Sequence, residues 1–224
     1  MKVLLISANT ERISMVALPL GLGLVAAAAR RAGHAVTFLD LLRAGDPLAA
    51  VRGAIEVARR DAIGVSVRNI DDQSRQEPHF LLEKAAELVA ECRRNSPAPV
   101  VLGGAGYSIF PREVLGYLGA DFGRRGDGEE AFPELLRRLE AWLDPRGIPG
   151  LYAAGDAAGG GLAVAERLGP LPQWDDALLS GLDPADEELW IPVQTRRGCP
   201  NDCSYCSTAR IQGRAIRCGS AQTA

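Results

Sequence analysis

The chain is poor in histidine, with only His34 and His79 among its 224 residues. Neither lies near a cysteine in the sequence, so a zinc site that mixes cysteine and histidine ligands has no local histidine to use. Long apolar runs are also absent: no stretch approaches the length of a membrane span, and the apolar start of the chain is too short for a signal peptide. The net charge of −3 gives no general attraction to nucleic acid. These absences predict a cytoplasmic protein without a membrane span and without a nucleic-acid partner.

Cysteine, by contrast, is concentrated in one place. Three of the five cysteines, Cys199, Cys203 and Cys206, form the pattern C-x3-C-x2-C. A loop of this kind offers three thiolates, which leaves one iron of a cubane [4Fe–4S] cluster open to bind something else. A structural or electron-carrying cluster would normally be closed by a fourth cysteine. The spacing therefore predicts a cluster with one chemically available iron.

Two other uses of these thiols stay open. Structural zinc needs four ligands, and the one candidate for the fourth is Cys218, which has no second cysteine or histidine beside it. A disulfide would suit a secreted protein, but nothing else marks the chain as secreted. Cys92 falls on a predicted helix face and reads as a buried small hydrophobic residue. We therefore favour the iron–sulfur cluster over both alternatives.

Before the cysteines, short apolar strands alternate with amphipathic helices, which is typical of a parallel sheet with crossover helices. Strands are predicted at residues 3–7, 35–39, 62–67, 99–102 and 121–124. Helices are predicted at residues 21–32, 47–60, 78–94, 111–118 and 129–142. The pattern predicts an α/β fold, a five-stranded, doubly wound, Rossmann-like parallel sheet over residues 1–145.

Two further regions follow this domain. Residues 146–188 are predicted to form a small hairpin, from 151–153 and 162–164, and then a linker rich in proline, aspartate and leucine. Residues 189–224 would begin a second domain, with 189–195 as the strand that leads into the cysteine loop.

Open parallel sheets bind ligands beyond the carboxyl ends of their strands. Glycines at these ends let a large flat ligand or a phosphate approach the backbone closely. The candidate binding residues at the predicted strand ends are Ser7, Asn9, Ser66, Arg68, Asn69, Gly103, Gly104, Gly126 and Gly128.

A rival pattern is G-x-G-x-x-A at residues 21–26, with acidic Asp40 at the end of the next strand. In a dinucleotide site the first glycine follows the strand directly. Here residues 9–20 intervene, so these glycines are better explained by close helix packing.

The cysteine motif, with aromatic Tyr205 directly before its third cysteine, resembles the signature of the radical S-adenosylmethionine superfamily. The resemblance implies that Cys199, Cys203 and Cys206 hold a [4Fe–4S] cluster. S-adenosylmethionine would bind the fourth iron, and Tyr205 would lie near its adenine. In that family the reduced cluster cleaves the cofactor to give a 5′-deoxyadenosyl radical, so the resemblance also implies a reductant such as flavodoxin or ferredoxin.

The first domain resembles the cobalamin-binding domain that precedes the catalytic domain in many radical S-adenosylmethionine proteins. The matching residues are 19–22 at the first helix, Ser66, Gly103-Gly104 and the run from Gly126 to Glu130. The chain departs from methyl-transferring relatives at one place: it has no D-x-H-x-x-G loop to supply a histidine to the lower face of cobalt. Either cobalamin binds without a protein histidine, with Arg68-Asn69 or the neighbouring loop facing the cobalt, or the domain has lost its ligand.

Together the two resemblances imply a cobalamin-dependent radical S-adenosylmethionine enzyme that carries out a radical methylation, rearrangement or cyclisation at an unreactive carbon. The alternative is a non-catalytic cobalamin- or metal-binding module. Only 25 residues follow Cys199, whereas a full barrel takes at least about 200. We therefore expect this chain to contain the first βα unit of an incomplete barrel, with no catalytic residue of its own and no activity alone.

Overall fold

The computed structural model describes residues 1–12, 16–72, 74–156, 159–169 and 189–219. The predicted linker falls mostly on residues 170–188, which lie outside the described residues. No helix in the described part of the chain is long and apolar enough to cross a membrane.

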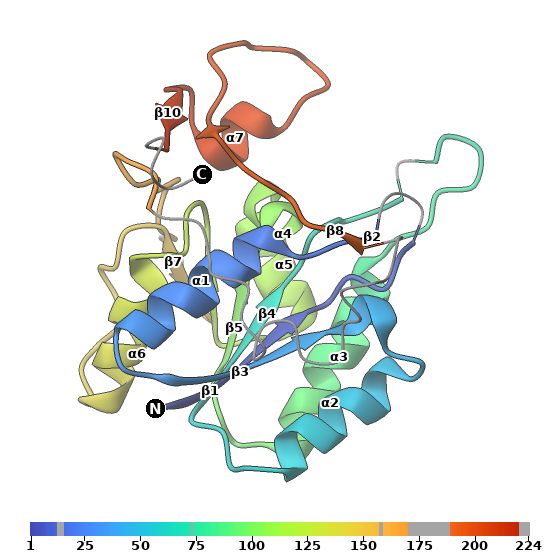
Figure 1. Cartoon of the computed structure of the whole chain (residues 1–224), viewed down its shortest axis with the longest axis vertical. Coiled ribbons are helices and arrows are strands. Elements are labelled where there is room, and N and C mark those ends of the chain that lie inside the picture. Colours follow the sequence, from blue (N-terminus) through green and yellow to red (C-terminus); the bar gives the residue numbers. More distant parts are fainter. Residues whose placement is uncertain (13–15, 73, 157–158, 170–188, 220–224) are drawn as a thin grey trace.

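The centre of the molecule is a six-stranded sheet (Figure 1). Its order is β3-β1-β4-β5-β6-β7, and all neighbours are parallel except β6 and β7. The strands are β1 (Lys2–Ser7), β3 (Ala35–Asp40), β4 (Ala62–Ser66), β5 (Val100–Gly103), β6 (Phe122–Arg124) and β7 (Leu151–Ala153). The chain order reverses between β1 and β4, which is the point at which doubly wound sheets open a ligand crevice.

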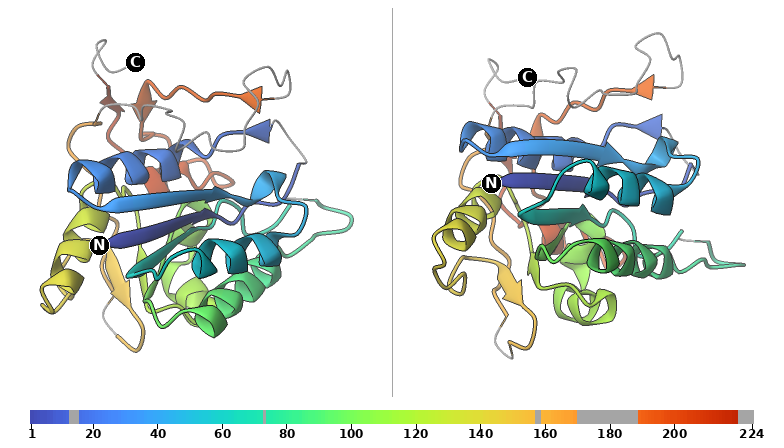
Figure 2. Two further views of the ribbon diagram at one scale, coloured as in Figure 1. Left: turned by 60° about the horizontal axis from the view of Figure 1, so that its bottom comes forward. Right: turned by 90° about the horizontal axis from the view of Figure 1, so that it is seen from below.

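Helices cover both faces of this sheet (Figure 2). One apolar cluster joins the sheet to α1 (Leu20–Arg31) and α6 (Ala131–Glu140). The other joins it to α2 (Pro47–Glu56), α3 (Leu82–Asn95) and α5 (Pro111–Leu118). In α3 the buried residues Leu82, Ala85, Leu88 and Cys92 recur at helical spacing, so one stripe packs on the sheet.

Local signals fix where several elements begin and end. Asp46 caps α2 by accepting a hydrogen bond from the backbone N–H of Ala49 at 3.0 Å, and Pro47 occupies the first turn. Gly119 ends α5 in the left-handed conformation, with φ of 64°. Two short elements follow strands: η1 (Leu41–Arg43) after β3 and α4 (Ala105–Ile109) after β5.

The predicted fold class is confirmed, with one strand more than the five predicted. Residues 151–153 form β7 and pair antiparallel with β6, so the sheet continues past residue 145. The predicted hairpin therefore differs from the structure: Ala163, on its second arm, bridges in parallel to Gly126 instead of completing a two-stranded ladder with 151–153. The division into three domains stays a prediction.

The segment from 189 onward lies across the carboxyl edge of the sheet (Figure 1). Of the predicted strand 189–195, only β8 (Leu189–Trp190) is a strand, and it pairs in parallel with β2 (Val16–Ala17). The chain then forms β9 (Arg196–Arg197), the cysteine loop with α7 (Thr208–Gln212), and β10 (Arg217–Cys218), which pairs antiparallel with β9.

Candidate functional site

A cavity of about 420 Å³ opens at the carboxyl edge of the sheet. The ends of β1, β4, β5 and the loop after β6 form its floor, and the start of α1 forms one wall. Pro192, Gln194, Arg197, Ile211 and Gln212, from the segment around the cysteine loop, line its mouth. The cavity therefore lies between the sheet domain and the segment that carries the cysteines.

Most of the predicted binding residues line this cavity. The eight that do so are Ser7, Asn9, Ser66, Arg68, Gly103, Gly104, Gly126 and Gly128. Asn69 instead lines a separate small depression, together with Asn9, Arg68 and Lys84. Tyr205 is 91% exposed and lies outside the cavity. Contact of any of these residues with a ligand stays a prediction.

An apolar part of the cavity was not predicted. Leu5, Gly64, Val101, Leu102 and Phe132 line it, so it reaches below the strand ends into the layer between the sheet and α6. A Cβ atom at Gly64 would lie 2.6 Å from Cδ2 of Leu5 and 3.5 Å from the ring of Phe132. The missing side chain at Gly64 thus lets Leu5 and Phe132 pack closely against the backbone of β4 beside the cavity. The sequence shows only an apolar strand here, with no sign of a cavity.

The two adjacent glycines after β5 have different roles. Gly104 has φ of +98°, and a Cβ atom there would lie 2.4 Å from the carbonyl oxygen of Val67. Gly103 has no atom within 4 Å of its Cβ position and lines the cavity. Gly104 is therefore required by the backbone itself, while Gly103 leaves space that a ligand could use.

Ser108 joins two strand ends, a role that sequence reasoning missed. Its buried hydroxyl donates to the carbonyl of Gly104 at 2.8 Å and accepts from the backbone N–H of Gly126 at 3.3 Å. The ends of β5 and β6 are thereby held together beside the cavity.

Asp40, at the end of β3, also lines the cavity. Burial raises its pKa above the ordinary value, although hydrogen bonds from the Ser7 hydroxyl and from the backbone N–H of Leu42 partly offset that effect. The cavity floor therefore carries a carboxyl group that resists ionisation next to Ser7, its register partner in β1.

Two hydrogen bonds close the cysteine loop at its base. The N–H of Cys199 donates to the carbonyl of Gly213 at 3.1 Å, and the N–H of Gly198 donates to Oε1 of Gln212 at 3.2 Å. Gly198 has φ of +92°, and a Cβ atom there would lie 2.0 Å from the carbonyl oxygen of Ala215. Glycine before the first cysteine is thus needed for the two ends of the loop to meet.

All three motif cysteines are free thiols; Cys203 and Cys206 are exposed and Cys199 is half-buried. Hydrogen bonds with the side chain and backbone of Thr208 hold the pKa of Cys206 below its ordinary value. The thiols are not gathered at metal-ligand distances, and no group of three or more histidine, cysteine or acidic residues among the described residues is so arranged. The donor set nevertheless fits a cluster, because three free thiols stand within one short loop.

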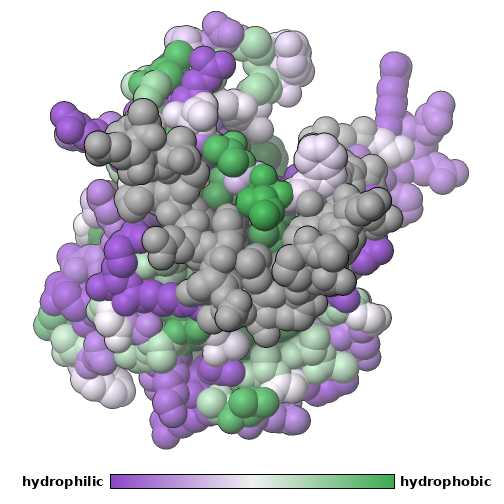
Figure 3. All heavy atoms as spheres, viewed as in Figure 1, coloured by the Kyte–Doolittle hydropathy of each residue, from purple (hydrophilic) through white to green (hydrophobic). Residues whose placement is uncertain are grey.

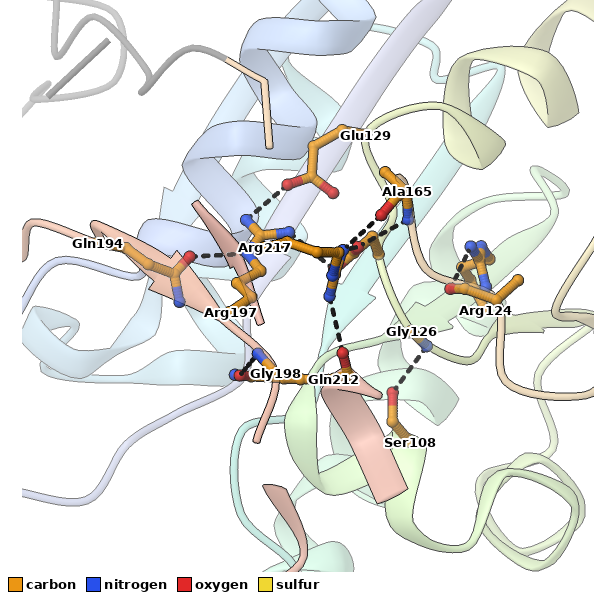
Figure 4. A network of polar contacts seen from close by, with 12 residues as sticks. Ser108, Arg124, Gly126, Glu129, Ala165, Gln194, Arg197, Gly198, Gln212 and Arg217 are labelled. Carbon is orange, nitrogen blue, oxygen red and sulfur yellow. Dashed lines mark hydrogen bonds and ion pairs between the residues drawn. The ribbon is translucent and has the colours of Figure 1, made fainter. Parts of the chain in front are cut away.

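Four charged side chains connect this loop to the end of β6 (Figure 4). Arg197 donates from Nη1 to Oδ1 of Asp127 at 2.8 Å and forms an ion pair with Glu129 at 2.6 Å. Arg217 donates from Nη1 to Oδ2 of the same Asp127. Burial alone would raise the pKa of Asp127, but the hydrogen bond from Arg217 and the charge of Arg197 outweigh it and hold that pKa below its ordinary value.

Comparison with protein families identifies the sheet domain. The model of the B12-binding domain matches residues 6–136. The chain belongs to the B12-binding domain family. The cobalamin-binding domain expected from the sequence is thereby confirmed.

Its relatives include enzymes of known activity. The tryptophan 2-C-methyltransferase of Streptomyces laurentii is 30% identical over 146 residues, which are 64% of this chain and 24% of that protein. The hopanoid C-3 methylase of Methylococcus capsulatus is 28% identical over 220 residues, 89% of this chain and 37% of that protein. The radical S-adenosylmethionine methyltransferase TsrM from Kitasatospora setae, solved with cobalamin and a [4Fe–4S] cluster bound, has the same fold, with a TM-score of 0.81 and 24% identity over 99% of this chain. The chain spans less than half the length of each of these proteins.

Neither histidine of this B12-binding chain lies at the cavity. His34 precedes β3 at the amino edge of the sheet and lies 3.3 Å from the amino group of Met1. His79 is paired with Asp72 at 2.7 Å on an exposed loop. The residues of the cavity wall after β1 and β4 are Asn9 and Arg68. Among the described residues, no histidine lines the cavity.

Figure 3 shows apolar surface next to the region where the 189–195 segment crosses the strand ends. Ile191 and Val193 of this segment are exposed at 56% and 65%. They lie beside Pro192 and Gln194, which line the cavity of the B12-binding domain.

Proposed function

We propose that this chain binds cobalamin in the cavity at the carboxyl edge of the sheet and a [4Fe–4S] cluster on Cys199, Cys203 and Cys206. Its activity would be that of a cobalamin-dependent radical S-adenosylmethionine methyltransferase. The observation that carries this proposal is the position of the cysteine segment, whose residues Arg197, Ile211 and Gln212 line the mouth of the cavity in the B12-binding domain.

The cavity has features that suit cobalamin. Gly103 leaves open space at the strand end, and Ser7 and Ser66 face each other in register across β1 and β4. The apolar part beside Gly64 offers a dry environment for a flat aromatic group. Arg68 is exposed and lines the cavity together with Asn9, and these two polar side chains would help to hold the cofactor there.

The cysteine loop would hold the cluster through three thiolates, leaving one iron for the amino and carboxyl groups of S-adenosylmethionine. Tyr205, exposed between the second and third cysteines, is free to pack on the adenine. When bound, these groups would supply one-electron chemistry and a carbon carrier, fed by a reductant such as flavodoxin or ferredoxin. A cytoplasmic location would keep both thiols and cluster reduced.

Methyl transfer is favoured over rearrangement or cyclisation because the relatives named above are methyltransferases and a methylase. By their names, one acts on tryptophan and the other on a hopanoid, and neither name assigns a substrate to this chain.

The test is to load the purified chain with the cluster and cobalamin at the same time. After anaerobic treatment with iron, sulfide and hydroxocobalamin followed by gel filtration, we expect about four irons, about four sulfides and about one cobalt per chain. Zinc retained without uptake of sulfide would contradict the cluster. Failure to retain cobalt at high micromolar hydroxocobalamin would mean a B12-binding fold that has lost its ligand.

A further inference from the structure

Two arginines stand at the two ends of the cysteine loop and meet on one carboxylate. Arg197 precedes the loop on β9, and Arg217 follows it on β10, where the two residues are register partners. Arg197 binds Oδ1 of Asp127 and Arg217 binds Oδ2, so both oxygens of a single side chain are used. Asp127 belongs to the loop after β6, in the B12-binding domain.

Three side chains hold the guanidinium group of Arg197 in place. Its Nε donates to Oε1 of Gln194 at 2.7 Å, its Nη1 to Asp127 at 2.8 Å, and its Nη2 pairs with Glu129 at 2.6 Å. Three acceptors placed around one guanidinium fix its position and its plane, which a single point charge would not do.

The network is also buried. The side chains of Asp127, Arg197 and Arg217 are only 8%, 11% and 5% exposed. Burying charges costs desolvation energy, and apolar residues of similar size often stabilise a protein as well or better. The main consequence of this arrangement is therefore geometric: it holds the base of the cysteine loop in one place.

The same side chains line the ligand cavity. Asp127, Glu129 and Arg197 all contribute to its wall, between Gly126 and Gly128 on one side and Gln194 on the other. A ligand that restrains the 126–129 loop would therefore also restrain Arg197, which lies two residues before Cys199.

We propose that Asp127 is a positioning residue that holds the cysteine loop over the B12 cavity and makes the position of that loop depend on whether the cavity is filled. This rests on the proposed function for the nature of the ligand, but the positional link is a property of the chain itself. Coupling of this kind is reciprocal, so ordering of the loop would also favour the filled cavity.

The first test needs no cofactor. Hydrogen–deuterium exchange of the full chain is compared between wild type, Asp127→Asn and the control Asp202→Asn. Asp202 pairs with Arg214 in the same loop at 2.6 Å, but both side chains are exposed. We expect amides of residues 198–217 to exchange at least about tenfold faster in Asp127→Asn and within about twofold of wild type in Asp202→Asn. Equal exchange in wild type and Asp127→Asn, with β1 and β4 still protected in both, would overturn the proposal.

The variant Arg197→Lys tests whether the loop is held by the planar set of donors of Arg197 or only by its positive charge. Lysine keeps the positive charge but cannot supply donors to Gln194, Asp127 and Glu129 in one plane. We expect the loop of Arg197→Lys to exchange as fast as that of Asp127→Asn, and wild-type exchange in this variant would contradict a geometric role. If Asp127→Asn does not fold, Glu129→Gln, which removes one contact at a side chain 19% exposed, should give a smaller change in the same direction.

The second test adds hydroxocobalamin, with binding followed by absorbance. At hydroxocobalamin concentrations that absorbance shows to saturate each protein, we expect it to slow exchange of residues 198–217 in wild type and to leave that segment unchanged in Asp127→Asn, whose affinity should be lower because the coupling is reciprocal. Slowing of equal size in the two proteins would overturn the coupling. Absence of binding to wild type would contradict the proposed function, while the cofactor-free comparison would still decide whether Asp127 positions the loop.

Discussion

Nη1 of Arg197 lies 2.8 Å from Oδ1 of Asp127, although 70 residues separate the two in the chain. The contact joins the start of the cysteine loop to the last parallel strand end of the B12-binding domain. The mouth of the cavity is therefore built from two parts of the chain that are distant in sequence. The ion pair places the base of the candidate cluster loop next to the candidate cobalamin site.

Protonation of Asp127 should loosen this contact. Because its pKa lies below the ordinary 3.8, the ion pairs stabilise the folded chain above that pH, and this contribution is lost as pH falls through the pKa of the folded state. Between about pH 6 and about pH 3 we expect the Tm of wild type to fall more than that of Asp127→Asn. The Tm of each protein is measured against pH by circular dichroism. An equal fall in Tm for the two proteins would show that the folded state does not stabilise the charged form of Asp127.

Cys203→Ala should abolish cluster assembly, because it removes one of the three thiolates. The matched controls are Cys92→Ala and Cys218→Ala, which should keep about four irons per chain. Burial raises the pKa of Cys92 to about 12, so it stays a protonated thiol in the core. Cys218 is exposed on β10. The measurement is the iron and sulfide content of each variant after anaerobic reconstitution. Loss of the cluster in Cys218→Ala would show that Cys218 is a fourth ligand.

Gly103→Val should weaken hydroxocobalamin binding by at least about tenfold, because the new side chain enters open space in the cavity and meets no protein atom near its Cβ. Gly116→Val, on the exposed face of α5 with similarly open space, is the control and should bind as wild type. Gly104 is a poor choice for this test, since its Cβ would clash with the Val67 carbonyl and disturb the backbone itself. Unchanged affinity in Gly103→Val would place the ligand elsewhere.

Cobalamin bound in its cob(II) state should show no nitrogen superhyperfine splitting from a histidine in its electron paramagnetic resonance spectrum. His34 lies at the amino edge of the sheet and His79 is paired with Asp72, both away from the cavity. A His79→Ala variant with the same spectrum would support this reading. Splitting that disappears in His79→Ala would instead show that the exposed loop folds over the cobalt.

Ser108→Ala should lower the free energy of unfolding by about 0.5–1.5 kcal/mol, because it removes the two part-buried hydrogen bonds by which the hydroxyl links Gly104 to Gly126. Urea denaturation measures the change. Ser74→Ala, in an exposed loop where the hydroxyl accepts from the N–H of Glu77 at 3.3 Å, is the control and should change stability by less than about 0.5 kcal/mol.

Local pattern was sufficient for the α/β class, for the five parallel strands and for the cysteine motif. Strand and helix periodicity depends on residues a few positions apart, and the binding of a cluster by C-x3-C-x2-C depends on spacing within one loop. The strand-end candidates such as Ser7, Ser66 and Gly103 could be placed at one edge because parallel strands all end on the same side.

The tertiary structure alone decided what joins these pieces. The antiparallel pairing of Leu151–Ala153 with Phe122–Arg124, the cavity at the strand ends and the convergence of Arg197 and Arg217 on Asp127 all involve residues far apart in the chain. Nothing in the local sequence of an arginine says which carboxylate it will meet, because the energy of that choice comes from burial and packing around both partners. The sequence by itself therefore determined the fold class and the three thiols, and the folded chain determined that the base of the cysteine loop lies at the cavity.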